Sequence, residues 1–192
     1  MSNRQHWGGK FRKLWPSEAA KFREHLLRLD PASRRTRFTH AVSDCFIADY
    51  ASHMADSGSI VYAFLDDNGL VRAAAELKKL GTTWGRDAEA AFSVEADYQD
   101  HGLGSELMGK VIRSARNRGV EHLYISCLAS NTKMQAIARK YDASLRFESG
   151  EVVGEILPEG PDYFSVLAEA AEDRADYVMA VLDLRHRLLQ AA

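Results

Sequence analysis

A turn with two glycines joins a strand-like segment to a helix-like segment, and it constrains the fold more than any other feature of the chain. The turn lies within YQDHGLGSEL, residues 98–107. The segment before it, AEAAFSVE, has strand character. After it, apolar residues recur at the period of a helix, at Leu103, Leu107, Val111, Ile112 and Ala115. This strand–turn–helix unit favours a mixed α/β domain.

The N-terminal part of the chain predicts one strand followed by helices. Residues 10–15 alternate between polar and apolar in the manner of a strand. A first helix is expected to have Ser17 as its N-cap and to end at Pro31. A short basic helix is expected in residues 31–38, and an amphipathic helix is expected to begin at Ser43.

The middle of the chain changes to a strand meander and then alternates between strand and helix. Asn68-Gly69, between two apolar runs, is the strongest short hairpin signal in the chain. The helix after the glycine turn is expected to stop at Gly119. The later elements are expected to be a buried strand at 122–129, a helix at 131–141 and two strands within 143–156 that turn at Ser149-Gly150.

The tail of the chain, residues 162–190, is helical by pattern and carries two apolar stripes. This is more apolar surface than one packed helical face requires. We therefore expect the tail to pack either on its own domain or on a second subunit, and the surplus favours a homodimer.

Composition excludes several classes of protein. The formal charge is −2, from 25 basic and 27 acidic residues, which argues against a nucleic-acid partner. No apolar run approaches the 18 residues of a membrane span, so neither a membrane span nor a signal peptide is expected. Cys45 and Cys127 are expected to be reduced and buried, which favours a cytoplasmic protein. The seven histidines form no metal-ligand pattern, so no metal is expected.

The glycine turn fits neither of two common nucleotide motifs. A phosphate-binding P-loop would place Ser or Thr after Gly109-Lys110, where the chain has Val111. A dinucleotide-binding turn would place a third small residue at Leu107. Two readings stay open from these residues alone: a tight turn without a ligand, or a turn whose amides and helix dipole bind an anion such as a pyrophosphate.

The residues around the turn resemble a known family. FSVEADYQDHGLGSELM is similar to motif A of the GNAT N-acetyltransferase superfamily, with Gln99-x-x-Gly102-x-Gly104 as its centre. NTKMQAIARKYDA resembles motif B in the form found in bacterial protein lysine acetyltransferases, and LDPASRRTRF resembles a helix near the start of those domains. The resemblance covers about residues 8–157. It implies a GNAT domain at 1–157 and a helical extension at 158–192.

Two positions depart from the family pattern. The Gly-Phe that usually closes motif B is Asp142-Ala143, and the tyrosine that many members use as a proton donor is Ala138. Tyr98, Tyr124 and Tyr141 are other candidate donors, although each has an ordinary structural reading. The departures concern the general acid and not the fold.

The resemblance implies acetyl-CoA as co-substrate and a specific fold. That fold is a mostly antiparallel mixed sheet of about six or seven strands, splayed apart at the acetyl-CoA site and flanked by helices. The turn amides would hold the pyrophosphate, while the strand end and an asparagine would hold the pantetheine. The implied acetyl-CoA-binding residues are Phe92, Ser93, Val94, Gln99, Asp100, His101, Gly102, Leu103, Gly104, Ser105 and Asn131.

A general base is the catalytic group to find, because an alkylammonium acceptor with a pKa near ~10.4 must lose a proton before it attacks. The resemblance implies Glu89, on the strand before the glycine turn, and Glu76 is its rival. If the intervening loop centres on Thr82-Thr83, the two glutamates face each other across an antiparallel pair. The alternative is that both are solvated residues of a strand face.

The expected function is transfer of an acetyl group from acetyl-CoA to a primary amine, with a protein lysine as the first candidate acceptor. A small-molecule amine, such as a polyamine or an antibiotic, is the second candidate. A non-catalytic module that binds acetyl-CoA is the alternative from another class, and Ala138 with Asp142-Ala143 favours it. The acceptor cannot be read from the sequence, because acceptor clefts are built from variable segments on a shared fold.

Overall fold

The computed structural model describes residues 8–54 and 58–190 and contains a single seven-stranded sheet with six helices over that part of the chain. Residues 1–7 and 191–192, which belong to the regions expected at 1–157 and 158–192, lie outside the described residues. The strands are β1 (Gly9–Leu14), β2 (Ile60–Asp66), β3 (Val71–Lys79), β4 (Asp87–Val94), β5 (His122–Leu128), β6 (Ser144–Glu148) and β7 (Glu151–Ile156). The helices are α1 (Ala19–Arg28), α2 (Pro31–Phe38), α3 (Asp44–Ser52), α4 (Leu103–Arg116), α5 (Thr132–Lys140) and α6 (Tyr163–Gln190).

The sheet confirms the mixed α/β prediction. Its strand order is β1-β2-β3-β4-β5-β7-β6, and only the β4–β5 pair is parallel. That pair has three rungs, from Asp87↔His122 to Glu89↔Tyr124. Beyond the third rung, the described parts of β4 and β5 share no further pairing, so the sheet opens at its centre.

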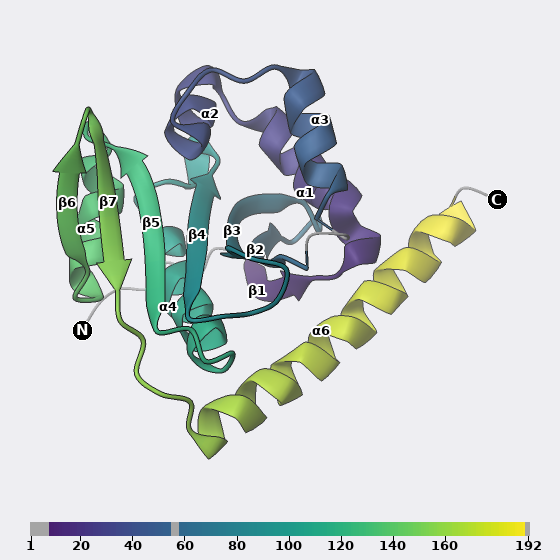
Figure 1. Ribbon diagram of the computed structural model, residues 1–192. Coiled ribbons are helices and arrows are strands. Elements are labelled where there is room, and N and C mark those ends of the chain that lie inside the picture. Colours follow the sequence, from purple (N-terminus) through teal and green to yellow (C-terminus); the bar gives the residue numbers. More distant parts are fainter. Residues whose placement is uncertain (1–7, 55–57, 191–192) are drawn as a thin grey trace.

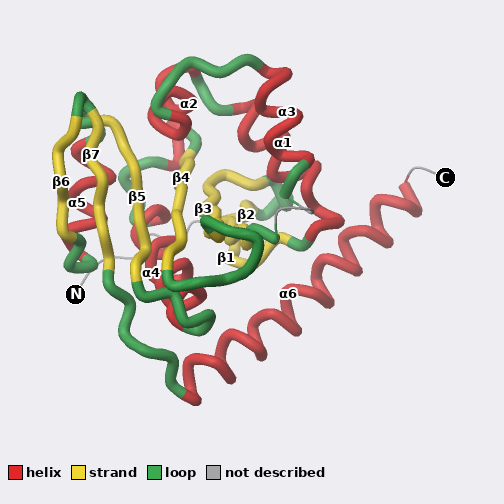
Figure 2. The backbone as a smooth tube through the Cα atoms, viewed as in Figure 1, coloured by secondary structure: helices red, strands yellow, loops and turns green. Residues whose placement is uncertain are grey.

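Helices cover both faces of the sheet (Figure 1, Figure 2), and each face carries its own hydrophobic core. On one face α4 and α5 bury residues such as Leu107 and Met134 against the strands. On the other face α1, α2 and α3 bury Phe22, Phe38 and Ile47. Each face therefore receives its own layer of helices, and the opening between β4 and β5 lies between these layers.

The hairpin and the later elements form where predicted, although β5 is buried on one face only. Asp66 stabilises the turn, because its Oδ1 accepts hydrogen bonds from the backbone N–H groups of Asn68 and Leu70. Gly69 has a φ of 74°, which a glycine adopts without a Cβ penalty. The register of β3 and β4 corrects one expectation. Glu76 lies opposite Ala91 and not opposite Glu89.

Two further expectations are wrong. A 3₁₀ turn occupies Pro16–Glu18, so Ser17 is not an N-cap. By contrast, α1 ends before Pro31, at Arg28, and the expected helix at 31–38 forms as α2. Pro31 begins α2, where a missing N–H costs nothing, and Asp30 caps that helix by accepting from the backbone N–H groups of Ala32 and Ser33. Cys127 is buried, but Cys45 is exposed on α3.

The C-terminal helix α6 lies along one side of the body, beside β1 (Figure 1). It docks through acidic residues. Glu169 is only 6% exposed and accepts hydrogen bonds from Asn117 Nδ2 at 2.6 Å and from Arg118 Nη1 at 2.7 Å. Further along, Asp183 accepts from Arg12 Nη2 at 3.0 Å. None of the described helices is long and apolar enough to cross a membrane.

Candidate functional site

The glycine turn has the backbone geometry of a loop that presents its amides. Asp100 and Gly102 have φ angles of 64° and 82°, both in the left-handed region that favours glycine. Gly102 is the N-cap of α4 and supplies no side-chain hydrogen bond to the first turn. The amides at the start of α4 and the positive end of its dipole are therefore available to an anion.

The second glycine has a packing role. A Cβ added at Gly104 would lie 3.1 Å from Ile137 Cδ1, which is tighter than normal contact. The small residue at this position therefore lets α4 approach α5. Packing alone therefore accounts for glycine at position 104. Gly102 is the stronger indication of anion binding.

Two lysines beside the turn were missed by sequence reasoning. Lys133 Nζ lies 2.8 Å from Asp100 Oδ2 and 3.3 Å from Gln99 Oε1. Lys140 Nζ donates to Ser105 Oγ at 2.7 Å. Both lysines lie on α5. The chain runs from α4 through β5, which is parallel to β4, and this connection brings α5 back beside the turn. They add positive charge where the first turn of α4 is already positive.

The remaining side chains of the turn hold it in place. Gln99 Nε2 lies 3.2 Å from the Val94 carbonyl oxygen and 3.3 Å from Ser33 Oγ, so it ties the end of β4 to α2. Leu103 is buried in the core, whereas His101 is exposed. The Tyr141 hydroxyl donates to the carbonyl of Ser105 at 2.7 Å. This hydrogen bond supports a structural role for Tyr141.

The end of β4 splits its side chains between the two faces of the sheet. Phe92 and Val94 pack against the core on the α4 face. Ser93 points to the face covered by α1, as strand alternation requires. Across the opening, Asn131 caps α5, because its Oδ1 accepts from the Met134 backbone N–H at 3.0 Å. The capping role of Asn131 is thus present in the structure.

The departure at the end of motif B has a local explanation. Asp142 follows α5 with a φ of 58°, a conformation that helix ends usually fill with glycine. Aspartate and asparagine tolerate this region better than other non-glycine residues. Asp142 therefore replaces glycine without disturbing the end of α5.

Glu76 belongs to a buried polar cluster. Its carboxylate is about 5% exposed and accepts a hydrogen bond from Arg37 Nη2 at 2.9 Å and another from the Tyr50 hydroxyl. Lys78 Nζ lies 3.8 Å from the same carboxylate oxygen. Burial raises the pKa of Tyr50 well above its usual value, so this hydroxyl stays protonated and donates. Glu76 is therefore fully engaged in joining α2 and α3 to the sheet.

Glu89 is placed differently, at the last rung of the β4–β5 pair where the sheet opens. Its side chain is half-buried, and among the described residues no hydrogen bond to its carboxylate is found. Lys78 is its cross-strand partner on β3. Burial lowers the pKa of Lys78, while Glu76 and Glu89 oppose that effect through their charges. Of the two glutamates, Glu89 is therefore the one whose carboxylate accepts no hydrogen bond from a described residue.

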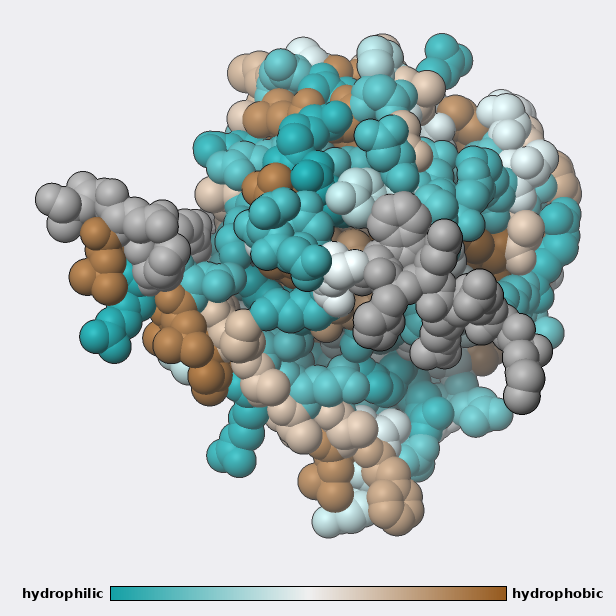
Figure 3. Space-filling view, turned by 180° about the vertical axis from the view of Figure 1, so that it is seen from behind, coloured by the Kyte–Doolittle hydropathy of each residue, from teal (hydrophilic) through white to brown (hydrophobic). Residues whose placement is uncertain are grey.

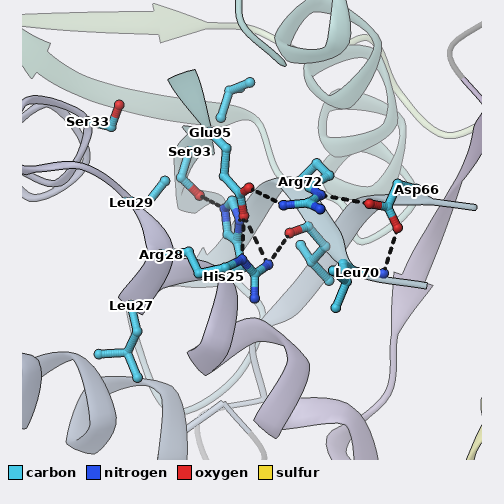
Figure 4. Close-up of polar contacts among 12 residues, drawn as sticks. His25, Leu27, Arg28, Leu29, Ser33, Asp66, Leu70, Arg72, Ser93 and Glu95 are labelled. Atoms are coloured by element: carbon cyan, nitrogen blue, oxygen red, sulfur yellow. Dashed lines mark hydrogen bonds and ion pairs between the residues drawn. The ribbon is translucent and has the colours of Figure 1, made fainter. Parts of the chain in front are cut away.

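A second polar cluster lies at the end of β4, and sequence reasoning missed it (Figure 4). His25 is fully buried on α1, with Nε2 2.9 Å from Ser93 Oγ and Nδ1 3.1 Å from Glu95 Oε1. Burial lowers the pKa of His25, so the ring is neutral near neutral pH. Because the Glu95 carboxylate can only accept, Nδ1 donates to it and Nε2 accepts from the Ser93 hydroxyl. Arg28 and Arg72 also bond Glu95, at 3.0 and 2.8 Å.

This second cluster fixes the strand end that leads into the glycine turn. It joins α1 and β3 to the residues on either side of Val94, immediately before the turn. A buried network of this kind stabilises one geometry only while every member is satisfied. Sequence spacing gave no signal for it, since His25 and Glu95 are 70 residues apart.

Comparisons with known proteins agree with the geometry. Residues 20–142 match the acetyltransferase (GNAT) family. Acetyltransferase Pat of Mycolicibacterium smegmatis is 40% identical over 70 residues, which are 36% of this chain and 21% of that protein. The matched part therefore spans about a fifth of that relative's length.

Solved structures share the fold. The GNAT domain of S. lividans PAT has a TM-score of 0.66 at 21% identity, covering 78% of this chain and 90% of that one. A cAMP-binding acyltransferase from Mycobacterium smegmatis has a TM-score of 0.59 at 23% identity, covering 90% of this chain and 52% of that one. The acetyltransferase yncA from Salmonella typhimurium, solved with acetyl-CoA, has a TM-score of 0.59 at 15% identity, covering 81% of this chain and 99% of that one.

Proposed function

Because the chain belongs to the GNAT acetyltransferase family, which uses acetyl-CoA as co-substrate, we propose that it acetylates a lysine side chain of a protein with Glu89 as general base. The observation that carries this proposal is the position of Glu89. Its carboxylate lies at the point where β4 and β5 stop pairing, and no other described residue bonds it. An amine that reached this opening would meet a carboxylate able to accept its proton, directly or through a water.

The acetyl-CoA would lie across the opening of the sheet. Its pyrophosphate would be held by the amides of residues 100–105, with Lys133 and Lys140 adding charge from α5. The side of β4 that no longer pairs with β5, residues 90–94, leaves backbone groups that can bond the pantetheine amides. Asn131, which already caps α5, stands at the far side of the same opening.

The acid half of the reaction needs less help than the base half. The leaving group is a thiol with a pKa of about 8.5, so its thiolate departs without a strong proton donor. This makes Ala138, in place of the usual tyrosine, compatible with turnover. The Tyr141 hydroxyl donates to the Ser105 carbonyl, and the Tyr124 hydroxyl lies 3.4 Å from Asp87 Oδ1, so both hydroxyls already have partners.

A protein lysine is favoured as acceptor by likeness. The form of motif B resembles that of bacterial protein lysine acetyltransferases, and the relatives include proteins named Pat and PAT. We also propose a cytoplasmic location, because Cys45 and Cys127 are both unpaired thiols, as is usual in a reducing compartment.

Release of CoA thiol tests the proposal. The full chain is given acetyl-CoA together with a lysine-containing peptide, the same peptide with its lysine replaced by arginine, a polyamine or an aminoglycoside. Thiol release with the lysine peptide alone is expected. Release only with a small amine would move the acceptor to the second candidate class. Calorimetric binding of acetyl-CoA without turnover on any amine would identify a non-catalytic binding module.

A further inference from the structure

The long C-terminal helix α6 is amphipathic in the reverse of the usual sense. Its acidic side faces the body, where residues such as Glu169 and Asp183 pair with basic side chains. Its apolar side faces outward (Figure 3). The large apolar residues exposed on α6 are Tyr163, Phe164, Val166, Leu167, Tyr177, Val178, Val181, Leu182, Leu184 and Leu189. A helix that packed only on its own domain would bury such residues instead.

The exposed area is large enough for a stable interface. These ten side chains are each between 38% and 81% exposed. At about 100 Å² each, judged from the area that a large side chain buries, they present on the order of 1,000 Å². A typical stable protein–protein interface buries about 800 Å² per partner. Patches of this size on a monomer mark interaction sites.

The spacing of the apolar residues indicates a helical partner. Tyr163, Leu167 and Ala170 are separated by intervals of four and three, and Tyr177, Val181 and Leu184 repeat these intervals 14 residues later. Alternating intervals of four and three form the heptad seam of paired helices. Arg174 stands at the seam position between these two sets, and the Tyr177 ring also packs against Trp15 of the same chain. The remaining positions form a seam whose complement is another helix with the same seam.

The charges of α6 argue against a membrane surface as the occupant of its apolar side. The outward side of the helix holds Arg174, whereas Glu172 is turned toward the body, where it pairs with Lys110 and Arg113. A helix that lies on a membrane presents a basic polar side to anionic lipids, whereas the polar side of α6 is acidic.

We propose that the outward apolar side of α6 is the interface of a homodimer, in which a second copy of this chain covers it with its own α6. This inference is independent of the proposed acetyl transfer, because it rests on residues outside the opening of the sheet. It also gives the helical extension at 158–192 a role.

The test is the oligomeric state of the full chain, measured by light scattering and by sedimentation over a range of concentrations. A mass of twice 21.4 kDa is expected. The double variant V178E/L182E should be monomeric, with a dissociation constant raised at least about 100-fold, since each buried carboxylate costs several kcal/mol. Both side chains are more than half exposed, so the fold should survive, and a thermal melt at low concentration checks this.

Leu80→Glu is the matched control, because Leu80 is 58% exposed in the loop between β3 and β4 and does not belong to α6. It should remain a dimer. A wild-type chain that stays monomeric at all concentrations would overturn the proposal, as would a dimer unaffected by V178E/L182E. A monomeric chain that binds lipid vesicles through α6 would overturn it in favour of a membrane surface.

Discussion

Replacing Glu89 and Glu76 in turn by glutamine separates catalysis from stability. Glu89→Gln keeps the shape of the side chain and removes its basicity. Loss of a general base typically lowers turnover by about 10² to 10⁴. Since no described residue bonds the Glu89 carboxylate, the free energy of unfolding should change by less than about 0.5 kcal/mol. The affinity for acetyl-CoA should stay within a few-fold, because Glu89 lies at the last β4–β5 rung, whereas the amides proposed to hold the pyrophosphate belong to residues 100–105.

Glu76→Gln should have the opposite effect. The carboxylate is about 5% exposed, as is the Arg37 side chain that bonds it at 2.9 Å. Neutralising one partner leaves the guanidinium without its counter-charge in a buried place. Breaking a buried ion pair in this way costs about 3–5 kcal/mol, which is a large fraction of the stability of an ordinary domain. Any fall in activity of Glu76→Gln should therefore follow the folded fraction.

The two variants are compared by initial rates of thiol release and by urea unfolding, in the same buffer. Rates are measured from neutral to high pH, because free amine becomes abundant as the pH approaches about 10.4 and should partly rescue Glu89→Gln. Wild-type turnover of Glu89→Gln at neutral pH would remove Glu89 from the mechanism. Full stability of Glu76→Gln together with lost turnover would make Glu76 the base.

Three further predictions concern the turn, the buried histidine and α6. Gly102→Val should weaken acetyl-CoA binding at least about tenfold, because its left-handed backbone disfavours a side chain by about 1–2 kcal/mol. The control Gly69→Val has a similar φ of 74° in the β2–β3 hairpin. It should be less stable in urea unfolding, while calorimetry should show acetyl-CoA binding like that of the wild type. Since burial lowers the pKa of His25, the unfolded chain binds more protons, so stability should fall as the pH drops below about 6.5. His25→Asn should reduce this fall of stability with decreasing pH. An unchanged pH dependence would contradict its assignment to His25. Glu169→Ala should lower the free energy of unfolding by about 3 kcal/mol, and a silent substitution would show that α6 is not anchored there.

The glycine turn and the element order were predictable because they depend on local rules. The Asn68-Gly69 hairpin, the N-cap at Ser43 and the left-handed Gly102 each follow from residues within a few positions of one another. The register of β3 against β4 did not follow. The expected pairing of Glu76 with Glu89 is two residues away from the observed pairing with Ala91. A shift of two keeps every side chain on the same face of a strand, so the apolar pattern does not distinguish the two registers.

Polar contacts between residues far apart along the chain could not be predicted from the sequence either. The helical tail was predicted from its period, but the side that packs is the acidic side. Its basic partners lie on β1, on α1, on α4 and just after α4. Lys133 reaches the glycine turn only through the crossover into α5. The exposure of Cys45 shows the same limit, since an apolar context along the chain does not specify which face of α3 meets the sheet.

The three-rung junction between β4 and β5 also affects how the molecule opens and closes. Strands β1 to β4 form one antiparallel meander, and β5, β7 and β6 form a separate antiparallel leaf. Few backbone hydrogen bonds cross between them. Native-state hydrogen exchange should therefore resolve two cooperative units, with the amides of the smaller leaf exchanging through a partial opening that leaves the meander folded. A ligand bound across the junction would protect both leaves together, so acetyl-CoA should slow exchange in β6, a strand that is separated from β4 by two others.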